Sequence, residues 1–141
     1  MKRILVALDS SPRAELVLST AARLAATTGA KLVLFRAITL PELPNEVFAM
    51  PQARVEDILR AEAHAQLDKL AAAVDRALIE RITTELATPW DGITREAKKV
   101  DADLIVIGSH GYGRLDRLLG TTAAKVVNHA DRNVLIVRTP L

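Results

Sequence analysis

The sequence predicts an α/β fold, in which a mostly parallel five-stranded sheet lies between two layers of helices. Short apolar runs of strand length alternate with longer segments whose apolar residues recur every three or four positions. Hydrophobic residues make up 50% of the chain and aromatic residues only 3%, a composition that suits aliphatic helices packed flat on a sheet. There is no internal repeat or linker, so residues 1–141 are expected to form a single domain.

The first two predicted strands and the helix between them form a βαβ unit. Ile4–Leu8 and Lys31–Ile38 are apolar runs of strand length, and such units are nearly always right-handed parallel crossovers. Ser11 is expected to cap the helix and Pro12 to be its first residue, because the amide hydrogen that proline lacks would have no helical partner there. The helix is expected to end at Gly29. Its sheet-facing residues are expected to be Val17, Ala21, Leu24 and Thr28.

A loop and a long helix follow. Residues 39–51 contain three prolines and little periodicity, so they are expected to form a loop, which is a candidate lid over the end of a strand. The next apolar residues have the spacing of one long amphipathic helix. They are Val55, Leu59, Ala63, Leu67, Leu70, Val74 and Leu78.

The second half of the chain continues the alternation. Residues 82–86 alternate between apolar and polar, which predicts a half-exposed strand near a sheet edge. Thr88-Pro89 opens a short helix, and Leu104–Ile107 and Val134–Val137 are expected to be the remaining strands, with a helix over Thr121–His129 between them. The sheet-facing residues of the short helix are expected to be Ile93, Ala97 and Val100.

Glycines are concentrated after the strand at 104–107. Gly108, Gly111, Gly113 and Gly120 fall within thirteen residues. Glycine adopts positive φ at little cost and has no Cβ, so such a loop allows main-chain N–H groups to converge on one point. The free amides of the following helix add a partial positive charge. The loop is therefore suited to holding phosphate, although a merely tight turn is the alternative.

Two standard phosphate-binding motifs do not match this loop. Arg114 and Leu115 stand where a P-loop has its lysine and its Ser or Thr. Asp116 stands at the third glycine of the dinucleotide-binding fingerprint. The pattern that remains is Gly108-x2-Gly111-x8-Gly120-Thr121-Thr122.

This glycine pattern, with Ile4–Ser10 at the start of the chain and Val134–Val137 at its end, resembles the universal stress protein family. The resemblance covers essentially the whole chain. It implies a Rossmann-like three-layer α/β/α sandwich with strand order 3-2-1-4-5. The nucleotide-binding branch is usually described with nine residues between the second and third glycines, whereas this chain has eight. Some members with shorter loops are also regarded as ATP binders.

The implied strand order predicts where a ligand would bind. In open α/β sheets, ligands bind beyond the carboxyl ends of the strands where the winding reverses. Asp9 would lie there and accept hydrogen bonds from a ribose or base, although a turn-forming or helix-capping aspartate is the alternative. The resemblance implies that Ala7 and Ala37 contact adenine through main-chain groups. The candidate nucleotide-binding residues are Ala7, Asp9, Ser10, Ala37, Ile107, Gly108, His110, Gly111, Gly113, Arg114, Gly120, Thr121, Thr122 and Ala123.

No catalytic residue is predicted. His110 lies in the glycine loop, but a general base needs an orienting partner and a nucleophile within reach, and the sequence shows neither. His110 is instead expected to stabilise the loop through a hydrogen bond. Arg114 and Arg117 could neutralise phosphate charge, or could be ordinary solvated cations.

Composition restricts the partners. A net charge of +2 without a basic run does not indicate nucleic-acid binding, and no apolar stretch approaches the ~20 residues of a membrane span. There is no cysteine, and His64 and His129 lack metal-ligand spacing, so no metal site is predicted. The N-terminal apolar run is too short for a signal peptide, which favours a cytoplasmic location. The chain is expected to form a homodimer through Val134–Val137, which is an edge strand in the family order.

The leading hypothesis is a universal stress protein that binds ATP, which Mg²⁺ can accompany, and acts as a nucleotide-dependent regulatory dimer in the stress response. Enzymatic activity beyond slow ATP hydrolysis is not expected. Two alternatives remain open from the residues: a weak ATP-hydrolysing or adenylyl-transferring enzyme, and a nucleotide-free dimerisation module of the same family. The sequence does not distinguish ATP from AMP or a cyclic nucleotide.

Overall fold

The computed structural model describes residues 1–40, 51–109 and 120–138, and its centre is a five-stranded parallel sheet. The strand order is β3-β2-β1-β4-β5, and every neighbouring pair is parallel. Both features confirm the predicted fold. The strands are β1 (Arg3–Ala7), β2 (Lys31–Ile38), β3 (Ile79–Leu86), β4 (Leu104–Gly108) and β5 (Asn133–Val137).

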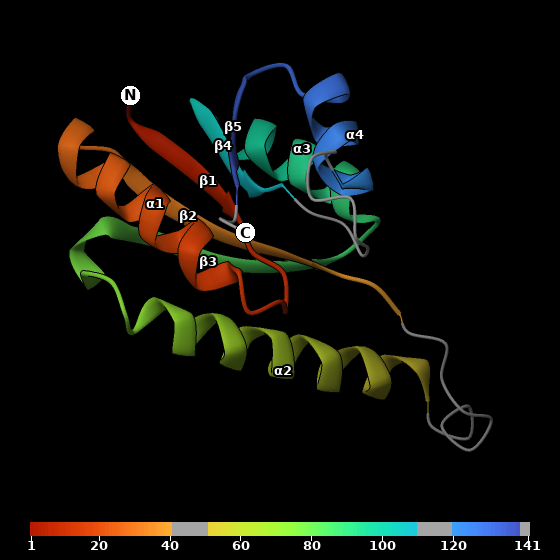
Figure 1. Ribbon diagram of the computed structural model, residues 1–141. Coiled ribbons are helices and arrows are strands. Elements are labelled where there is room, and N and C mark those ends of the chain that lie inside the picture. The colour runs from red at the N-terminus through yellow and green to blue at the C-terminus, as the bar shows by residue number, and fades with distance from the viewer. Residues whose placement is uncertain (41–50, 110–119, 139–141) are drawn as a thin grey trace.

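Helices cover both faces of the sheet (Figure 1). Helices α1 (Ala14–Thr28) and α2 (Gln52–Ala71) pack on one face, and α3 (Pro89–Lys99) and α4 (Thr121–His129) pack on the other. Because successive strand residues point to opposite faces, Ile4 and Val6 contribute to the core under α1 and α2, whereas Leu5 contributes to the core under α3 and α4. All three side chains are fully buried, as expected for a central strand.

The start of α1 differs from the prediction. The helix begins at Ala14 rather than Pro12, and its N-cap residue is Arg13 rather than Ser11. The cause is a turn that starts at Asp9, whose Oδ1 accepts a hydrogen bond from Ser11 N at 2.9 Å. Ser11 O in turn accepts a bond from Ala14 N at 3.2 Å. The chain therefore completes a turn over residues 9–13 before the helix begins.

The C-terminus of α1 confirms one expectation and corrects another. Gly29 ends the helix with a φ of 78°, a conformation that favours glycine, and its N–H donates to Ala25 O. Thr28 was expected to face the sheet, but it is exposed and donates its hydroxyl to Leu24 O at 2.8 Å. The buried face of the helix contains the predicted Val17 and Ala21, together with Ala14, Leu18 and Ala25.

The predicted long helix is shorter than expected. Helix α2 ends at Ala71, and Leu78 belongs to a separate 3₁₀ helix, η2 (Arg76–Leu78). Asp75 starts this short helix, because its Oδ1 accepts a hydrogen bond from Ala77 N at 2.9 Å. Val74 and Leu78 still pack against the core under α1 and α2. The apolar spacing therefore continues through a turn, so it does not indicate one continuous helix.

Helices α3 and α4 begin at the predicted residues, whereas β3 begins at Ile79 rather than at Ile82. Strand β3 lies at one edge of the sheet and β5 at the other. Thr88 is the N-cap of α3 and Pro89 its first residue. Trp90 packs between helices, where its ring lies 4.4 Å from the ring of His129.

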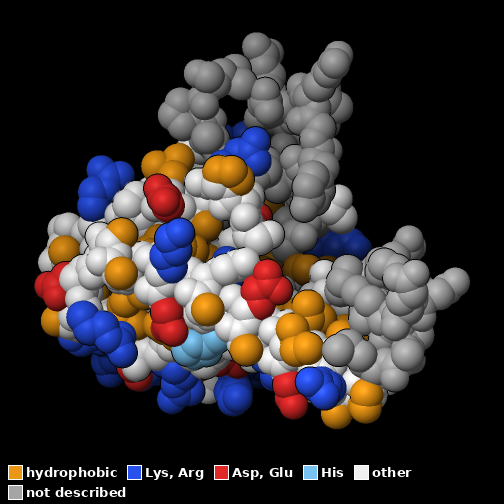
Figure 2. All heavy atoms as spheres, turned by 90° about the horizontal axis from the view of Figure 1, so that it is seen from below, with side chains coloured by type: hydrophobic (Ala, Val, Ile, Leu, Met, Phe, Trp, Pro, Cys, Tyr) orange, Lys and Arg blue, Asp and Glu red, His pale blue; other side chains and the backbone are white. Residues whose placement is uncertain are grey.

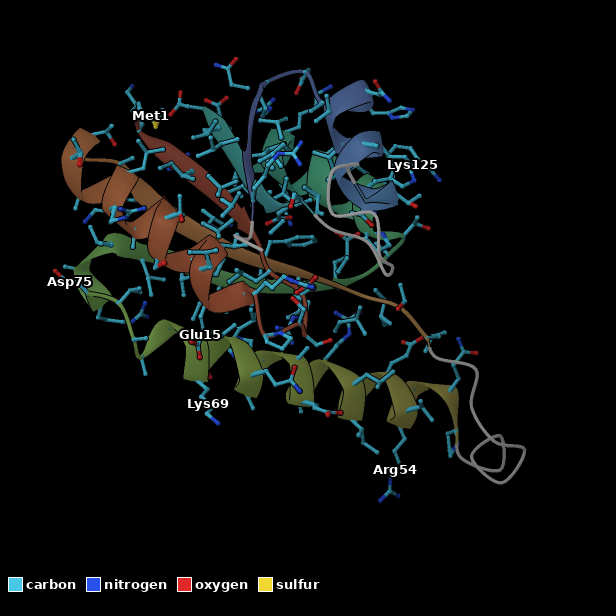
Figure 3. All side chains as sticks on the ribbon, viewed as in Figure 1. Met1, Glu15, Arg54, Lys69, Asp75 and Lys125 are labelled. Atoms are coloured by element: carbon cyan, nitrogen blue, oxygen red, sulfur yellow. The ribbon has the colours of Figure 1, made fainter. Side chains whose placement is uncertain are left out.

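Charged side chains are spread over the surface. Arg54 and Lys69 point from α2 away from the sheet (Figure 3). On the face seen from the α2 side, Lys and Arg side chains are interspersed with Asp and Glu (Figure 2). Within the described ranges, no helix combines the length and the apolar character that a membrane span requires.

Candidate functional site

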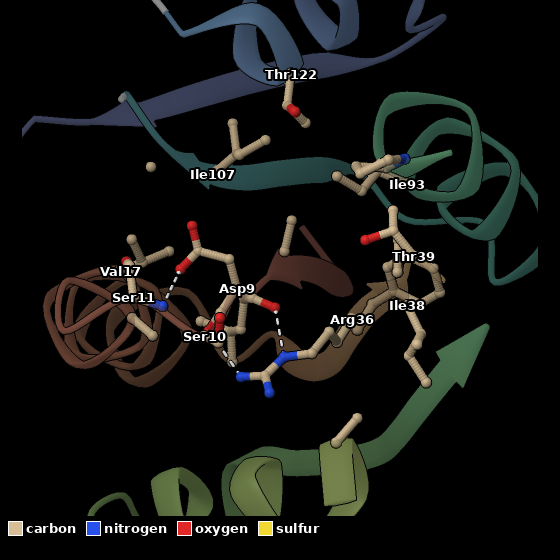
Figure 4. A pocket seen from close by; sticks show the side chains of 18 of the residues that line it. Asp9, Ser10, Ser11, Val17, Arg36, Ile38, Thr39, Ile93, Ile107 and Thr122 are labelled. Carbon is tan, nitrogen blue, oxygen red and sulfur yellow. Dashed lines mark hydrogen bonds between the residues drawn. The ribbon is translucent and has the colours of Figure 1, made fainter. Parts of the chain in front are cut away.

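A cavity of about 730 Å³ lies beyond the carboxyl ends of β1, β2 and β4 (Figure 4). The chain winds from β1 to β2 and β3 on one side of the sheet, and then crosses to β4 and β5 on the other. The cavity thus lies where the winding reverses, the place at which open α/β sheets bind ligands. Its volume is within the range of small-molecule sites, which is about 300–1,000 Å³.

One wall of the cavity is apolar. Ala7, Ala37 and Ile107 line it from three adjacent strands, and Ile93 lines it from α3. The two alanines carry only a methyl group, so their strands leave space that a larger side chain would fill. An apolar wall of this kind suits the flat, apolar part of a ligand.

A second wall presents main-chain groups from the end of β4 and the start of α4. Gly108, Thr121 and Thr122 line the cavity there. The N-cap residue of α4 is Gly120, which has no side chain to accept hydrogen bonds from the first-turn amides. Those amides and the helix dipole give this wall a partial positive charge. An oxyanion is the ligand group that such a wall favours.

Asp9 also lines the cavity, two residues after the end of β1. Its side chain is exposed and forms the turn with Ser11 described above. The turn-forming role that was the alternative at this position is therefore real. A carboxylate has about four acceptor sites, so this bond leaves Asp9 able to accept hydrogen bonds from a ligand as well.

Arg36 is the charged residue beneath this loop, and sequence reasoning missed it. It is only 7% exposed. Its Nε donates to Leu8 O at 3.1 Å, its Nη2 donates to Asp9 O at 2.7 Å, and its Nη1 donates to Gln66 Oε1. Burial lowers the pKa of the Arg36 guanidinium, while the negative charge of Asp9 acts in the opposite direction. A cation within the otherwise apolar run 32–38 was a signal that could have identified it.

Helix α2 supplies a wall that the sequence did not predict. Its cavity-lining residues are Leu59, Glu62, Ala63 and Gln66. Periodicity correctly turned Leu59 and Ala63 inward, but it does not show that this part of a helix borders open space rather than a packed core. Other lining residues that sequence reasoning did not include are Leu8, Ala14, Val17, Phe35, Ile38, Thr39, Pro89 and Ile93.

The structure brings most of the predicted site residues together. Those that line the cavity are Ala7, Asp9, Ser10, Ala37, Ile107, Gly108, Thr121, Thr122 and Ala123. Gly120 lies next to them as the N-cap residue of α4, and its N–H donates to Ser109 O at 2.8 Å. Four predicted site residues lie outside the described residues: His110, Gly111, Gly113 and Arg114. Arg117 and most of the candidate lid also lie outside them.

Comparison with known protein families identifies the chain. Residues 1–138 match the model of the universal stress protein family. The chain belongs to this family. Universal stress protein A homolog 1 from Coxiella burnetii is 32% identical over 143 residues, which cover 96% of this chain and 95% of the relative.

Two solved structures of universal stress proteins contain an adenine nucleotide. One, in complex with cAMP, is 26% identical, has a TM-score of 0.72, and is matched over 99% of this chain and 98% of its own. The other, from Archaeoglobus fulgidus in complex with dAMP, is 26% identical with a TM-score of 0.59, and 98% of each chain is covered. The predicted family membership is therefore confirmed.

Proposed function

We propose that this universal stress protein binds ATP in the cavity between β1 and β4 and acts as a nucleotide-dependent regulatory dimer in the cytoplasm. One observation carries the proposal. Asp9 is far in the sequence from Gly108 and the start of α4, yet all three line the same cavity. The complexes of two relatives with cAMP and dAMP support an adenine nucleotide as the ligand.

The chemistry of the walls supports a proposed position in the cavity for each part of the nucleotide. Adenine would lie against the apolar wall of Ala7, Ala37 and Ile107. The ribose would lie near Asp9 and Ser10, whose side chains provide hydrogen-bonding oxygens. The phosphates would lie at the second wall. Its proposed residues are Gly108, Gly120, Thr121, Thr122 and Ala123, together with His110, Gly111, Gly113 and Arg114 of the loop.

Mg²⁺ would reach the site with the phosphates of ATP. This ion keeps several waters and commonly uses one or two carboxylates together with substrate phosphates. Among the described residues, no group of three or more His, Asp or Glu side chains could hold a metal ion. The nucleotide itself would therefore supply the first ligands of the ion, and the cavity-lining carboxylates are those of Asp9 and Glu62.

The proposed output is regulatory rather than catalytic. A ligand that binds only the folded protein raises its stability by mass action, by about 2.7 kcal/mol at a hundred times Kd. Bound nucleotide would stabilise the loops around the cavity in the same way. A partner that contacts those loops would therefore distinguish the loaded protein from the empty one.

The test is to identify and titrate the ligand. Freshly purified protein is heat-denatured and the released small molecules are identified by mass spectrometry. Calorimetry with ATP, AMP, cAMP and inorganic tripolyphosphate then gives the preference. We expect ATP to bind most tightly, because it fills both the apolar wall and the oxyanion wall. Folded protein that binds no adenine nucleotide at millimolar concentration would contradict the proposal.

A further inference from the structure

We propose that Arg36 is a positioning residue for the nucleoside end of the cavity, because it holds the loop after β1 against α2. This inference rests on the proposed nucleotide binding. Arg36 would not itself contact the nucleotide. It would act through Asp9, the residue proposed to bind the ribose or base.

The geometry places Arg36 at the point where the chain leaves the sheet. Leu8 N still donates to Phe35 O at 2.9 Å, which continues the pairing of β1 with β2. The next two carbonyl groups, of Leu8 and Asp9, accept instead from the guanidinium of Arg36. Figure 4 shows Arg36 beneath the Asp9–Ser10 loop, on the side where α2 lies. The arginine thus takes over as hydrogen-bond donor where the sheet ends.

Burying the charged side chain of Arg36 on this face of β2 costs free energy. Leu32 and Leu34 occupy the same face of β2 and are fully buried, so an apolar residue would be the expected choice at position 36 as well. Arginine is rarely buried unless it is paired. Here its hydrogen-bond acceptors are two main-chain carbonyls and a glutamine, and the opposing charge comes from Asp9. In return for the cost of burying the cation, the loop after β1 is held in one position.

Asp9 is consequently fixed from two sides. Arg36 Nη2 holds its carbonyl oxygen, and Ser11 N holds its carboxylate oxygen. A binding group that is already in place loses little conformational entropy when the ligand arrives. Without Arg36, the loop would have to be ordered by the nucleoside, and the affinity would fall.

Gln66 anchors this arrangement to α2. Its side-chain oxygen accepts from Arg36 Nη1, and the same residue lines the cavity from the α2 side. The guanidinium therefore links β2, the loop after β1 and α2. Removing the glutamine should loosen the loop in the same direction as removing the arginine, but by less, because the two carbonyl contacts remain.

The experiment compares Arg36→Met with a matched control, Arg132→Met. Methionine keeps much of the apolar stem and removes the donors. Arg132 is also mostly buried, and it donates to two carbonyls, Ala97 O at 2.9 Å and Ala102 O at 2.8 Å. Ala102 precedes β4 and Arg132 precedes β5, so these contacts lie at the amino ends of the two strands, whereas the cavity lies beyond the carboxyl ends. Both variants should lose stability in urea.

Of these two variants, only Arg36→Met should bind the nucleoside more weakly. We expect ATP and adenosine to bind about tenfold more weakly to this variant by calorimetry, which corresponds to about 1.4 kcal/mol. Tripolyphosphate should bind as it does to the parent protein. Arg36→Lys should also bind ATP and adenosine weakly, because an ammonium group cannot reproduce the planar fork that reaches two carbonyls and Gln66. Full recovery by lysine, or an equal loss of ATP and tripolyphosphate, would overturn the inference.

A ligand-free measurement separates this inference from the proposed function. NMR order parameters of the Asp9 and Ser11 amides should fall in Arg36→Met and stay unchanged in Arg132→Met, whether or not the parent protein binds ATP. Unchanged order parameters in Arg36→Met would reject the positioning role. If Arg36→Met does not fold, Gln66→Leu decides the question, with an expected two- to threefold loss of adenosine affinity that converts to less than about 0.7 kcal/mol.

Discussion

Asp9 combines two tasks in one carboxylate, since it forms the turn after β1 and faces the cavity. Substitutions at this position separate the tasks. Asp9→Ala removes both, whereas Asp9→Asn keeps an oxygen that can accept the Ser11 amide and removes only the charge. We expect Asp9→Ala to weaken ATP binding more than tripolyphosphate binding in calorimetry. Asp9→Asn should lie between the parent and the alanine variant. Equal losses for ATP and tripolyphosphate would argue against contact between Asp9 and the nucleoside.

Asp103 predicts a pH dependence of stability. Its Oδ2 accepts hydrogen bonds from Arg3 N at 2.9 Å and Lys2 N at 2.6 Å, and these main-chain bonds lower the pKa of the carboxyl group. A group whose pKa is lower in the folded state stabilises the fold above its unfolded pKa, which is about 4 for aspartate. That contribution is lost as the pH falls through the folded pKa.

The corresponding measurement is urea unfolding of the parent and of Asp103→Asn at a series of pH values. The parent should lose stability more steeply than the variant below about pH 4, because only the parent must protonate this carboxylate to unfold in acid. Parallel stability curves for the two proteins would show that these bonds contribute no acid sensitivity.

Among single residues, Asp9 and Arg36 show what could and what could not be predicted from the sequence. The position of Asp9 was predictable, because a polar residue after an apolar run marks the end of a strand. The contacts of Arg36 were not, because its partners come from the loop after β1 and from α2, and their distance from β2 is set by tertiary packing. A buried cation can be suspected from its apolar neighbours in the sequence, but its hydrogen-bond acceptors cannot be named from them.

At the scale of elements, Gly92 sets how closely α3 approaches its neighbours. A Cβ at this position would lie 3.0 Å from Ala87 Cβ and 3.4 Å from Phe35 Cζ. We expect Gly92→Val to destabilise the protein by about 1–3 kcal/mol in urea unfolding, the usual cost of overpacking. Valine has a higher helix propensity than glycine, so the loss must come from packing.

Lys98→Val is the matched control for this prediction. Lys98 is exposed on the same helix, so its substitution tests valine in α3 without a steric conflict. The control should stay within about 0.5 kcal/mol of the parent, as is usual for surface substitutions. A Gly92→Val protein as stable as this control would mean that α3 shifts without cost.

Elements were predicted better than their ends. Each strand and helix had a clear apolar pattern, and the mistakes in the helix bounds occurred where local hydrogen bonds override such a pattern. The turn at Asp9 delays the start of α1, and the bond from Ala77 N to Asp75 separates η2 from α2. Periodicity reports which side chains face the core, and it continues unchanged when the chain turns and packs again.

At the scale of the whole molecule, β5 is the element proposed to join two copies. It lies at the edge of the sheet, and its residues Val134, Leu135 and Ile136 are only partly covered, with Leu135 37% exposed. Charges on edge strands oppose pairing with another chain. We expect the parent protein to be a dimer by light scattering at tens of micromolar and Leu135→Lys to shift toward monomer.

Ile58→Lys is the control for the dimer prediction. Ile58 is 49% exposed on α2, so the same charge is introduced on the surface of a helix rather than on the sheet edge. The control should remain a dimer. A parent protein that is monomeric at this concentration, or a dimer that survives Leu135→Lys and dissociates with Ile58→Lys, would contradict pairing through β5.

The order of the strands was the part of the architecture that periodicity could not supply. Alternating strands and helices fit several parallel arrangements, and the family motif selected the one observed. The cavity depends on that order, since only adjacent β1 and β4 bring Asp9 next to Gly108.

The hydrogen bond from Gly120 N to Ser109 O joins the two residues that flank positions 110–119. The anchor points of that segment are thus set by the framework and not by the number of residues between them. Adding or removing one residue there changes the entropy of closure only slightly. We therefore expect β4 and α4 to keep their positions when the number of residues between positions 109 and 120 changes by one.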